Sequence, residues 1–447
     1  MTNALVPKVT LAESAGNLGV PQTNQVVIGM IGVSSGGTAT VNTVQQVISV
    51  AQAETLFGAN TSKGADLLKM IKRAFQEGAS IVKAISIGTP TVAAATNANQ
   101  GLLTADSEAG AMTATVADAT IYTAGMVVYL GTNQSYDREE RLVVDTGVGT
   151  TVTFTTALKF KHYTGEDLKI ITQKTSSAYS TAITAMESDE DKSIVICDLN
   201  DDDTAALLKT MCDNSTVNYN TPCVYFRAPT FGEVAATVQT NATNHNSSRV
   251  VQLFPNLVDF NGKTLNPGET AAVVTGAIAL NGVPWPNHNL TSFVSVGNAE
   301  TKITDMDALI AAGVTPLELK GGTVHIVRLV TTYTLLNNVP STLWQEGSVR
   351  LNVDYIQRVL ARDVQAKFLQ KGQNPQTLLA LKQEVNAYLS QFASSNILVA
   401  DVTRNVPAFR PPVVTVDADD ATSVTVEIEI SPGKPLNFVN LKFSINL

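Results

Sequence analysis

The chain has 447 residues and a formal net charge of -9 at pH 7, with 15% charged and 44% hydrophobic residues. This length exceeds what one hydrophobic core usually supports, so we expect two or three domains. The acidic balance argues against nucleic acid as a main partner, and the low charged fraction is expected where much surface is buried against other subunits.

Export and membrane insertion are not indicated. No export signal is visible, and the longest clearly apolar stretch, 271–280, is about half of the roughly 20 residues that a membrane helix needs. Three cysteines form no CxxC pair, which favours synthesis in a reducing compartment: Cys197, Cys212 and Cys223.

The N-terminal residues 1–24 are interpreted as an arm. Val9 and Leu11 flank Thr10 in a short alternating stretch, and a loose run follows at 14–24. A period of two residues is the pattern of a strand with one buried face.

The first part of an α/β body follows the arm. Residues 25–32 predict a buried strand, and the run 41–50 is expected to be extended. Residues 67–75 predict a helix that Gly78 ends in a left-handed cap, and residues 80–87 predict another strand.

Residues 96–173 differ from their surroundings, with short strands at close spacing between Gly, Asp and Asn residues. Because the α/β pattern resumes afterwards, we expect a small all-β domain inserted in a surface loop.

The α/β body then comprises 25–95 plus 174–335. Its second part alternates strands and helices, which favours a largely parallel sheet with helices on its faces. Strands are expected at 193–197, 221–226, 249–254 and 324–334, and helices at 178–186, 204–212, 269–280 and 304–312.

The C-terminal domain, residues 336–434, carries a pair of amphipathic helices at 353–368 and 378–392. Asn374 followed by Pro375 specifies the start of the second helix. Earlier, Thr230 and Glu233 have the spacing of a capping box ahead of a further helix.

The last residues, 435–447, are interpreted as a C-terminal strand arm. The prolines and glycine at 432–435 suit a strand that leaves the body. The residues alone leave open whether both arms pair with the chain's own sheet or add strands to neighbouring copies. Five apolar residues alternate with polar ones in this arm: Val439, Leu441, Phe443, Ile445 and Leu447.

The order of several landmarks resembles the contractile tail sheath proteins of bacteriophages and related injection machines. One departure is the N-terminal arm, because sheaths often begin with a Pro-Gly-Val-Tyr-like arm and this chain reads VPKVT at 6–10. The similarity covers nearly the whole chain outside 96–173. The landmarks are the run 41–58 ending in AETLFG, the helix 67–75 with Gly78, the Ala/Gly helix after Pro267, the turn at Gly313, IVRLVTT at 326–332, the helix pair around Asn374 and the alternating C-terminal strand.

The resemblance implies a structural subunit, not an enzyme, and no catalytic, cofactor-binding or metal residues. Such a subunit forms stacked hexameric rings around an inner tail tube protein and contracts to drive the tube through the host envelope. Its other partners would be baseplate and tail terminator proteins. It would reside in the virion after assembly in the bacterial host cytoplasm, with the β domain outward, the C-terminal domain near the tube and the arms exchanged between subunits.

Arg358 and Arg362 are the candidate contact with the tube. They lie four residues apart on the face opposite the apolar stripe of their predicted helix, so they are neighbours. The near-neutral balance of 348–447 in an otherwise acidic chain favours this role. The alternative is a solvated face on which Arg358 pairs with Asp354.

An α/β hydrolase is the main alternative from another class. GVSSG at 32–36 matches the GxSxG pattern of a nucleophile elbow with Ser34 as nucleophile, but the following GTATV is not the start of a helix. The glycines fit neither common phosphate-binding pattern. A surface-array or adhesive protein, with the β domain as binding module, is a third hypothesis.

The acidic residues and histidines do not show the spacing of a metal site. The acidic loop 198–203 lacks the middle glycine and distal glutamate of a calcium hand, so helix capping and solvation explain it better. The histidines show no HxxxH or HxH spacing, so no metal site is predicted: His162, His245, His288 and His325.

Overall fold

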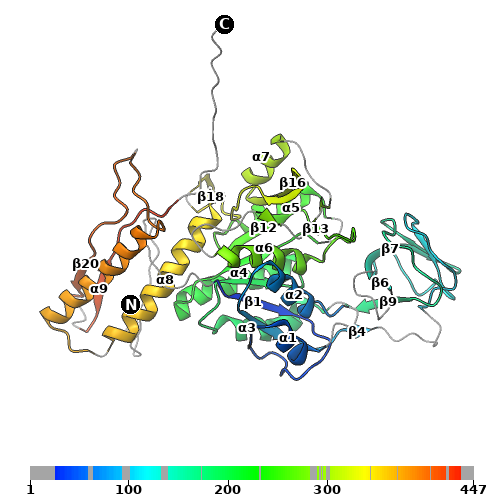
Figure 1. Cartoon of the computed structure of the whole chain (residues 1–447), viewed down its shortest axis with the longest axis horizontal. Coiled ribbons are helices and arrows are strands. Elements are labelled where there is room, and N and C mark those ends of the chain that lie inside the picture. Colours follow the sequence, from blue (N-terminus) through cyan, green and yellow to red (C-terminus); the bar gives the residue numbers. More distant parts are fainter. Residues whose placement is uncertain are drawn as a thin grey trace, which may run out of the picture.

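The computed structural model describes residues 26–433, with gaps at 59–63, 93–100, 132–138, 173, 231–232, 282–288, 291–292, 294, 298–302, 343, 370, 403 and 419–421. Figure 1 shows a central α/β body, a small β domain on one side of it, and a unit of two helices and a short sheet on the other. Within the described helices, no segment combines the length and the hydropathy needed to cross a membrane.

A nine-stranded sheet forms the centre of the body. Its strands are β1 (Ile28–Gly32), β2 (Gln45–Val47), β3 (Val82–Ser86), β10 (Ile194–Cys197), β11 (Val224–Arg227), β12 (Val250–Phe254), β14 (Asn289–Leu290), β16 (Val314–Lys320) and β17 (Thr323–Ile326). Their order is β14-β17-β16-β12-β11-β10-β1-β3-β2. Neighbours from β16 to β3 are parallel, whereas the pairs β3–β2, β16–β17 and β17–β14 are antiparallel. The predicted, largely parallel α/β sheet is confirmed.

Helices cover both faces of this sheet because its strands are apolar on both sides. In β10, Ile194 and Ile196 contribute to one buried cluster, whereas Val195 and Cys197 contribute to the other. The helices of the first face are α1 (Val50–Phe57), α2 (Leu67–Glu77) and α6 (Pro267–Asn281), and those of the second are α3 (Ser176–Glu187) and α4 (Asp202–Tyr219). Two further helices, α5 (Ala235–His245) and α7 (Ile303–Ala311), pack near β12 and β16.

Two glycines shape the packing of α2. Gly78 ends the helix at φ 116°, in the left-handed region, as predicted. On the facing helix α6, a Cβ at Gly276 would lie 2.6 Å from the carbonyl oxygen of Ala74, which is too close for any side chain. The small residues of α6 therefore allow the two helices to approach closely.

The inserted β domain is a six-stranded antiparallel sheet with its own buried cluster, which includes Tyr122, Leu142 and Phe154. Its strand order is β4-β9-β6-β7-β8-β5, formed by β4 (Thr91–Val92), β5 (Thr113–Thr115), β6 (Val127–Gly131), β7 (Glu140–Val148), β8 (Thr151–Phe154) and β9 (Asp167–Thr172).

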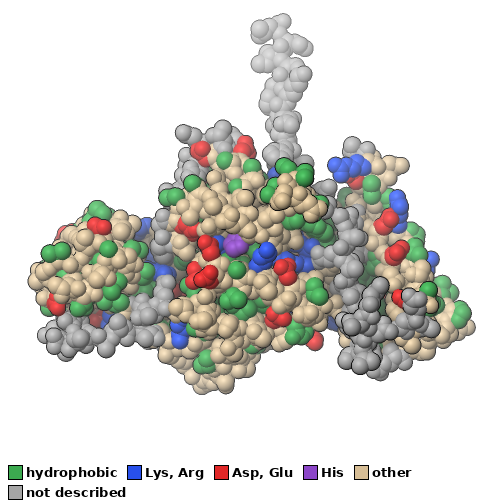
Figure 2. All heavy atoms as spheres, turned by 180° about the vertical axis from the view of Figure 1, so that it is seen from behind, with side chains coloured by type: hydrophobic (Ala, Val, Ile, Leu, Met, Phe, Trp, Pro, Cys, Tyr) green, Lys and Arg blue, Asp and Glu red, His purple; other side chains and the backbone are tan. Residues whose placement is uncertain are grey.

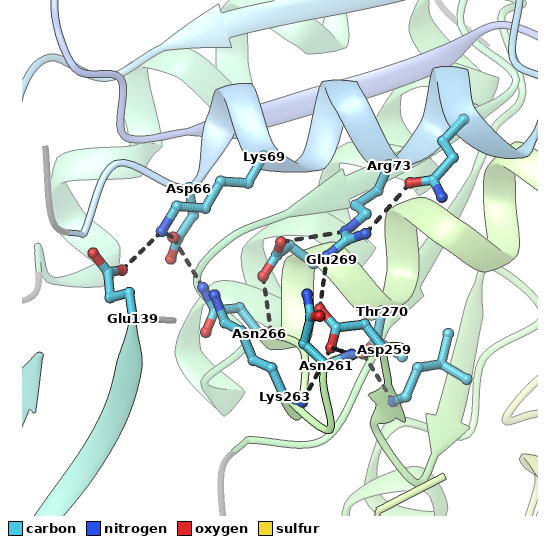
Figure 3. A network of polar contacts seen from close by, with 12 residues as sticks. Asp66, Lys69, Arg73, Glu139, Asp259, Asn261, Lys263, Asn266, Glu269 and Thr270 are labelled. Atoms are coloured by element: carbon cyan, nitrogen blue, oxygen red, sulfur yellow. Dashed lines mark hydrogen bonds and ion pairs between the residues drawn. The ribbon is translucent and has the colours of Figure 1, made fainter. Parts of the chain in front are cut away.

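A buried polar network joins this domain to the body (Figure 3). The Lys69 ammonium lies 3.1 Å from Glu139 of the β domain and 3.0 Å from Asp66, and Asn266 donates to Asp66 at 2.9 Å. Burial alone raises the pKa of Asp66, but Lys69 and Arg141 outweigh it and hold the pKa below its usual range. The orientation of the β domain is thus fixed by charges that water does not reach.

The C-terminal unit contains α8 (Gly347–Phe368), α9 (Pro375–Ser394), β20 (Val413–Val416) and β21 (Val424–Glu427). The fully buried Asp354 of α8 accepts hydrogen bonds from Arg249, next to β12, and from Arg350. Burial raises the pKa of Asp354, but the two guanidinium groups outweigh this effect and the pKa lies below its usual range.

Four local predictions differ from the structure. The strand predicted at 324–334 ends at Ile326, because the chain leaves the sheet and Thr331 bonds Gln345 ahead of α8. The helix predicted at 204–212 extends to Tyr219, where Asn220 provides a left-handed cap. Thr230 donates its N–H to Glu233 at 2.7 Å, but α5 begins only at Ala235, so this capping pair stabilises the preceding turn. Within 41–50, only β2 is a strand.

Replacing Lys69 by Met is expected to destabilise the protein by about 3 to 5 kcal/mol, because it removes the cation that is paired with both buried carboxylates, Asp66 and Glu139. The control is Lys161→Met, which removes an exposed pair with Glu108 and should change stability little. Urea unfolding measures both. Equal midpoints for the two variants would contradict a buried junction.

Candidate assembly interface

The helix α9 is positioned by the cap predicted from the sequence. The side chain of Asn374 accepts a hydrogen bond from the N–H of Thr377 at 2.8 Å, and Pro375 is the first helical residue. The apolar stripe of α9 is buried as its spacing predicts: Leu381, Val385, Leu389 and Phe392.

A two-stranded antiparallel sheet lies beside α9, at the end of the molecule opposite the β domain (Figure 1). In the part of the chain that the structure describes, β20 pairs only with β21, so each strand leaves one edge of N–H and C=O groups open. A sheet of two strands is marginal in water and gains stability when strands are added. These two edges are therefore the strongest candidate sites for assembly.

Valine side chains are exposed on the same unit. Val402 retains 88% of its accessible surface, and Val399, Val413 and Val416 are also exposed. Figure 2 shows apolar side chains on this unit interspersed with side chains of both charges, instead of one large apolar patch. Such a mixed surface suits a contact that forms between soluble subunits.

The structure places Arg358 and Arg362 beside one groove but in different environments. Arg358 is half-buried and donates to the carbonyl oxygen of Pro222, whereas Asp354, its expected partner, bonds Arg249 and Arg350. Arg362 is 62% exposed and pairs with Asp363 at 2.8 Å. Of the two arginines expected on an outer face, Arg362 is exposed and Arg358 is half-buried, because α8 packs against the body near Pro222. Their contact with a tube stays a prediction.

The terminal arms lie outside the described residues, so the structure does not place them. They include the predicted strand residues Val9, Leu11, Val439, Leu441, Phe443, Ile445 and Leu447.

Ser34 is buried, and its hydroxyl lies 2.6 Å from the hydroxyl of Ser86. A nucleophilic serine needs a base within hydrogen-bond reach, and a second serine is not one. The segment after Ser34 is not helical, as predicted: Thr38 and Ala39 donate to the carbonyl oxygens of Thr55 and Leu56. This geometry indicates a structural role for Ser34.

The acidic loop after β10 is only partly explained by capping. Asp201 accepts from the N–H of Thr204 at 2.7 Å and caps α4, as predicted. Asp198, by contrast, is not solvated: it accepts from the N–H of Val33 and the hydroxyl of Tyr179, both at 2.7 Å. Burial raises its pKa to about 6. The solvation expected for Asp198 from the sequence is wrong, because its carboxylate is enclosed by the segment after β1 and by α3.

The described histidines and cysteines all lie outside β20 and β21. His162 contacts Glu140 and Glu166, and burial together with Arg227 lowers the pKa of His245 to about 4. Where the chain is described, no cluster of three or more His, Cys, Asp or Glu is arranged to hold a metal ion. Cys212 and Cys223 are free thiols with their sulfurs 3.5 Å apart, and His288 lies outside the described residues.

The titration of Asp198 predicts a pH dependence. Because its folded pKa of about 6 exceeds the ordinary value of 3.8, the folded state binds the proton more tightly. The free energy of unfolding should therefore fall as pH rises from about 4 to about 6, by on the order of 3 kcal/mol from this group. Asp198→Asn should lack that decrease, although it loses a hydrogen bond at every pH. Urea titrations between pH 4 and 7.5 measure it, and parallel pH profiles for the two proteins would contradict the assignment.

No protein-family model matches the sequence, and no curated protein matches it. Several solved structures, by contrast, match this chain over nearly its whole length. A sheath tail protein from Desulfitobacterium hafniense is 14% identical with a TM-score of 0.58, covering 96% of this chain and 100% of its own. One from Listeria innocua is 12% identical with a TM-score of 0.59, covering 94% of both chains. The contracted helical sheath of the anti-feeding prophage is 11% identical with a TM-score of 0.59, covering 100% of both. The resemblance inferred from sequence is confirmed in the fold: this chain has the fold of contractile tail sheath proteins along nearly its whole length.

Proposed function

We propose that the protein is the sheath subunit of a contractile phage tail or related injection machine, which polymerises as stacked hexameric rings around an inner tube. The observation that carries this proposal is the similarity in fold, over the whole chain, to sheaths that include a contracted helical assembly. The two open edges of the β20–β21 sheet supply a means of polymerisation.

Strand addition accounts for how copies would join. The sequences at 1–24 and 435–447 alternate as expected for strands, and among the described residues β20 and β21 each offer one free edge. Backbone hydrogen bonds along an added strand give affinity without a large apolar surface. A contact of one surface with a different surface, which does not close, generates a helix of subunits.

Contraction then requires bodies to rotate while arms stay paired. A strand attached through a flexible linker keeps its hydrogen bonds as the bodies move. The free energy would come from better contacts between bodies in the contracted state, with no nucleotide needed. Shortening of the stack would then drive the tube through the host envelope.

The positions of the two outer domains suggest how the subunit would be oriented relative to the tube. The C-terminal domain 336–434 would face the tube and the inserted domain 96–173 would face outward, since they lie at opposite ends of the body (Figure 1). Of the two candidate arginines, Arg362 is the one exposed enough to contact a tube protein. Baseplate and terminator proteins would bind the ends of the stack, in a virion assembled in the host cytoplasm.

Deletion of residues 435–447 is expected to leave a folded protein that does not polymerise, because one strand donor is lost. Electron microscopy of the purified protein measures tube formation, and circular dichroism checks folding. A peptide of residues 435–447 should inhibit assembly of the full chain, whereas the same peptide with Leu441→Lys and Phe443→Lys should not. Normal tubes from the truncated protein would refute strand donation by this arm.

Arg362→Glu is expected to reduce assembly of the extended sheath on purified tubes, most clearly at low salt, because an exposed charge contact is reversed. Arg404→Glu is the matched control, since Arg404 is also exposed but lies outside α8. Cosedimentation with tubes measures assembly. If both variants assemble as the parent does, α8 is not the tube-binding surface.

A further inference from the structure

A groove of about 610 Å³ lies between α8 and the amino ends of three central strands. Tyr355 and Val359 of α8 line one side. Val27, Ile81 and Ser193, which directly precede β1, β3 and β10, line the other. The groove therefore combines apolar and uncharged polar side chains with charged ones. The charged residues that line it are Lys83, Glu190, Asp191, Arg358 and Arg362.

The cations along the groove are paired within the chain. Lys83 lies 3.3 Å from Asp189 and 3.5 Å from Asp191, and Arg362 pairs with Asp363 at the rim. Arg358 donates to the carbonyl oxygen of Pro222. An occupant without charge thus leaves these pairs intact, whereas a charged occupant would have to compete with them.

The N-terminal segment joins the body at this groove. The described chain begins at Val26, and the next residue, Val27, lines the groove. The preceding residues 14–25, SAGNLGVPQTNQ, include no charged side chain and carry Leu18 and Val20 among amides and hydroxyls. Twelve extended residues span up to about 40 Å, whereas α8 from Tyr355 to Ala366 extends about 17 Å, so the segment is long enough to follow the groove.

We propose that residues 14–25 of the same chain occupy this groove, which thereby sets the direction in which the N-terminal arm leaves the body. The occupant is assigned by where the described chain begins and by its lack of charge. The groove is formed by a single chain, so the inference does not rest on the proposed function.

Disulfide trapping tests the occupant directly. Gln365→Cys, at the groove, is combined in turn with Leu18→Cys, Val20→Cys and Gln22→Cys in the full chain, since the register is not specified. Mild oxidation of dilute protein should cross-link at least one pair with a yield at least about fivefold above the same partners combined with Lys382→Cys on the exposed face of α9. Mixing isotopically light and heavy chains distinguishes bonds within a chain from bonds between chains. Equal yields at both positions, or bonds only between chains, would overturn the proposal.

A groove-filling substitution gives a second measurement that does not need a new disulfide. Ala366→Trp, at an exposed position of the groove wall, should displace the segment and speed chymotrypsin cleavage after Leu18 several-fold. Ala380→Trp, at an exposed position of α9, is the matched control. An unchanged cleavage rate in Ala366→Trp, with the fold intact by circular dichroism, would also overturn the proposal.

Discussion

The buried carboxylate of Asp354 is the contact on which the arrangement of the subunit depends. It belongs to α8, has no exposed surface, and bonds both Arg249 of the body and Arg350 of its own helix. Separating α8 from the body would leave a charge in the interior without a partner, at a cost of several kcal/mol. The α8 helix and the sheet therefore behave as one body, and Lys69 with Glu139 joins the β domain to it in the same way.

This rigidity restricts where a conformational change can occur. Both ends of the molecule are held by buried charges, so a large rearrangement within the chain is disfavoured. The proposed contraction would therefore move whole subunits relative to one another. An apolar junction of the same area could be equally stable, but it would tolerate sliding, whereas paired charges specify one orientation. Rigid subunits linked through strand edges suit an assembly in which the same parts are packed in two ways.

Sequence patterns predicted the features that local rules determine. The strand at 193–197, the glycine at 78 and the Asn374 cap each obey a local constraint, and all were found. The error at Arg358 arose because α8 carries polar residues on faces that are nevertheless buried, where they satisfy one another; a pattern of apolar spacing cannot show this. The open edges of β20 and β21 were equally invisible, since alternation marks a strand but not its missing neighbour.

The described residues next to the two arms both lie on the side of the molecule away from the β domain. Val27 lines the groove under α8, and Gly433 donates to the carbonyl oxygen of Ile397 just after α9. The described chain therefore begins between the body and α8 and ends beside α9, both away from the β domain (Figure 1). If strands are exchanged, the exchange is concentrated on this side, where short linkers favour pairing by their high effective concentration. The β domain then has no part in the strand network, which leaves its surface free to differ without affecting polymerisation.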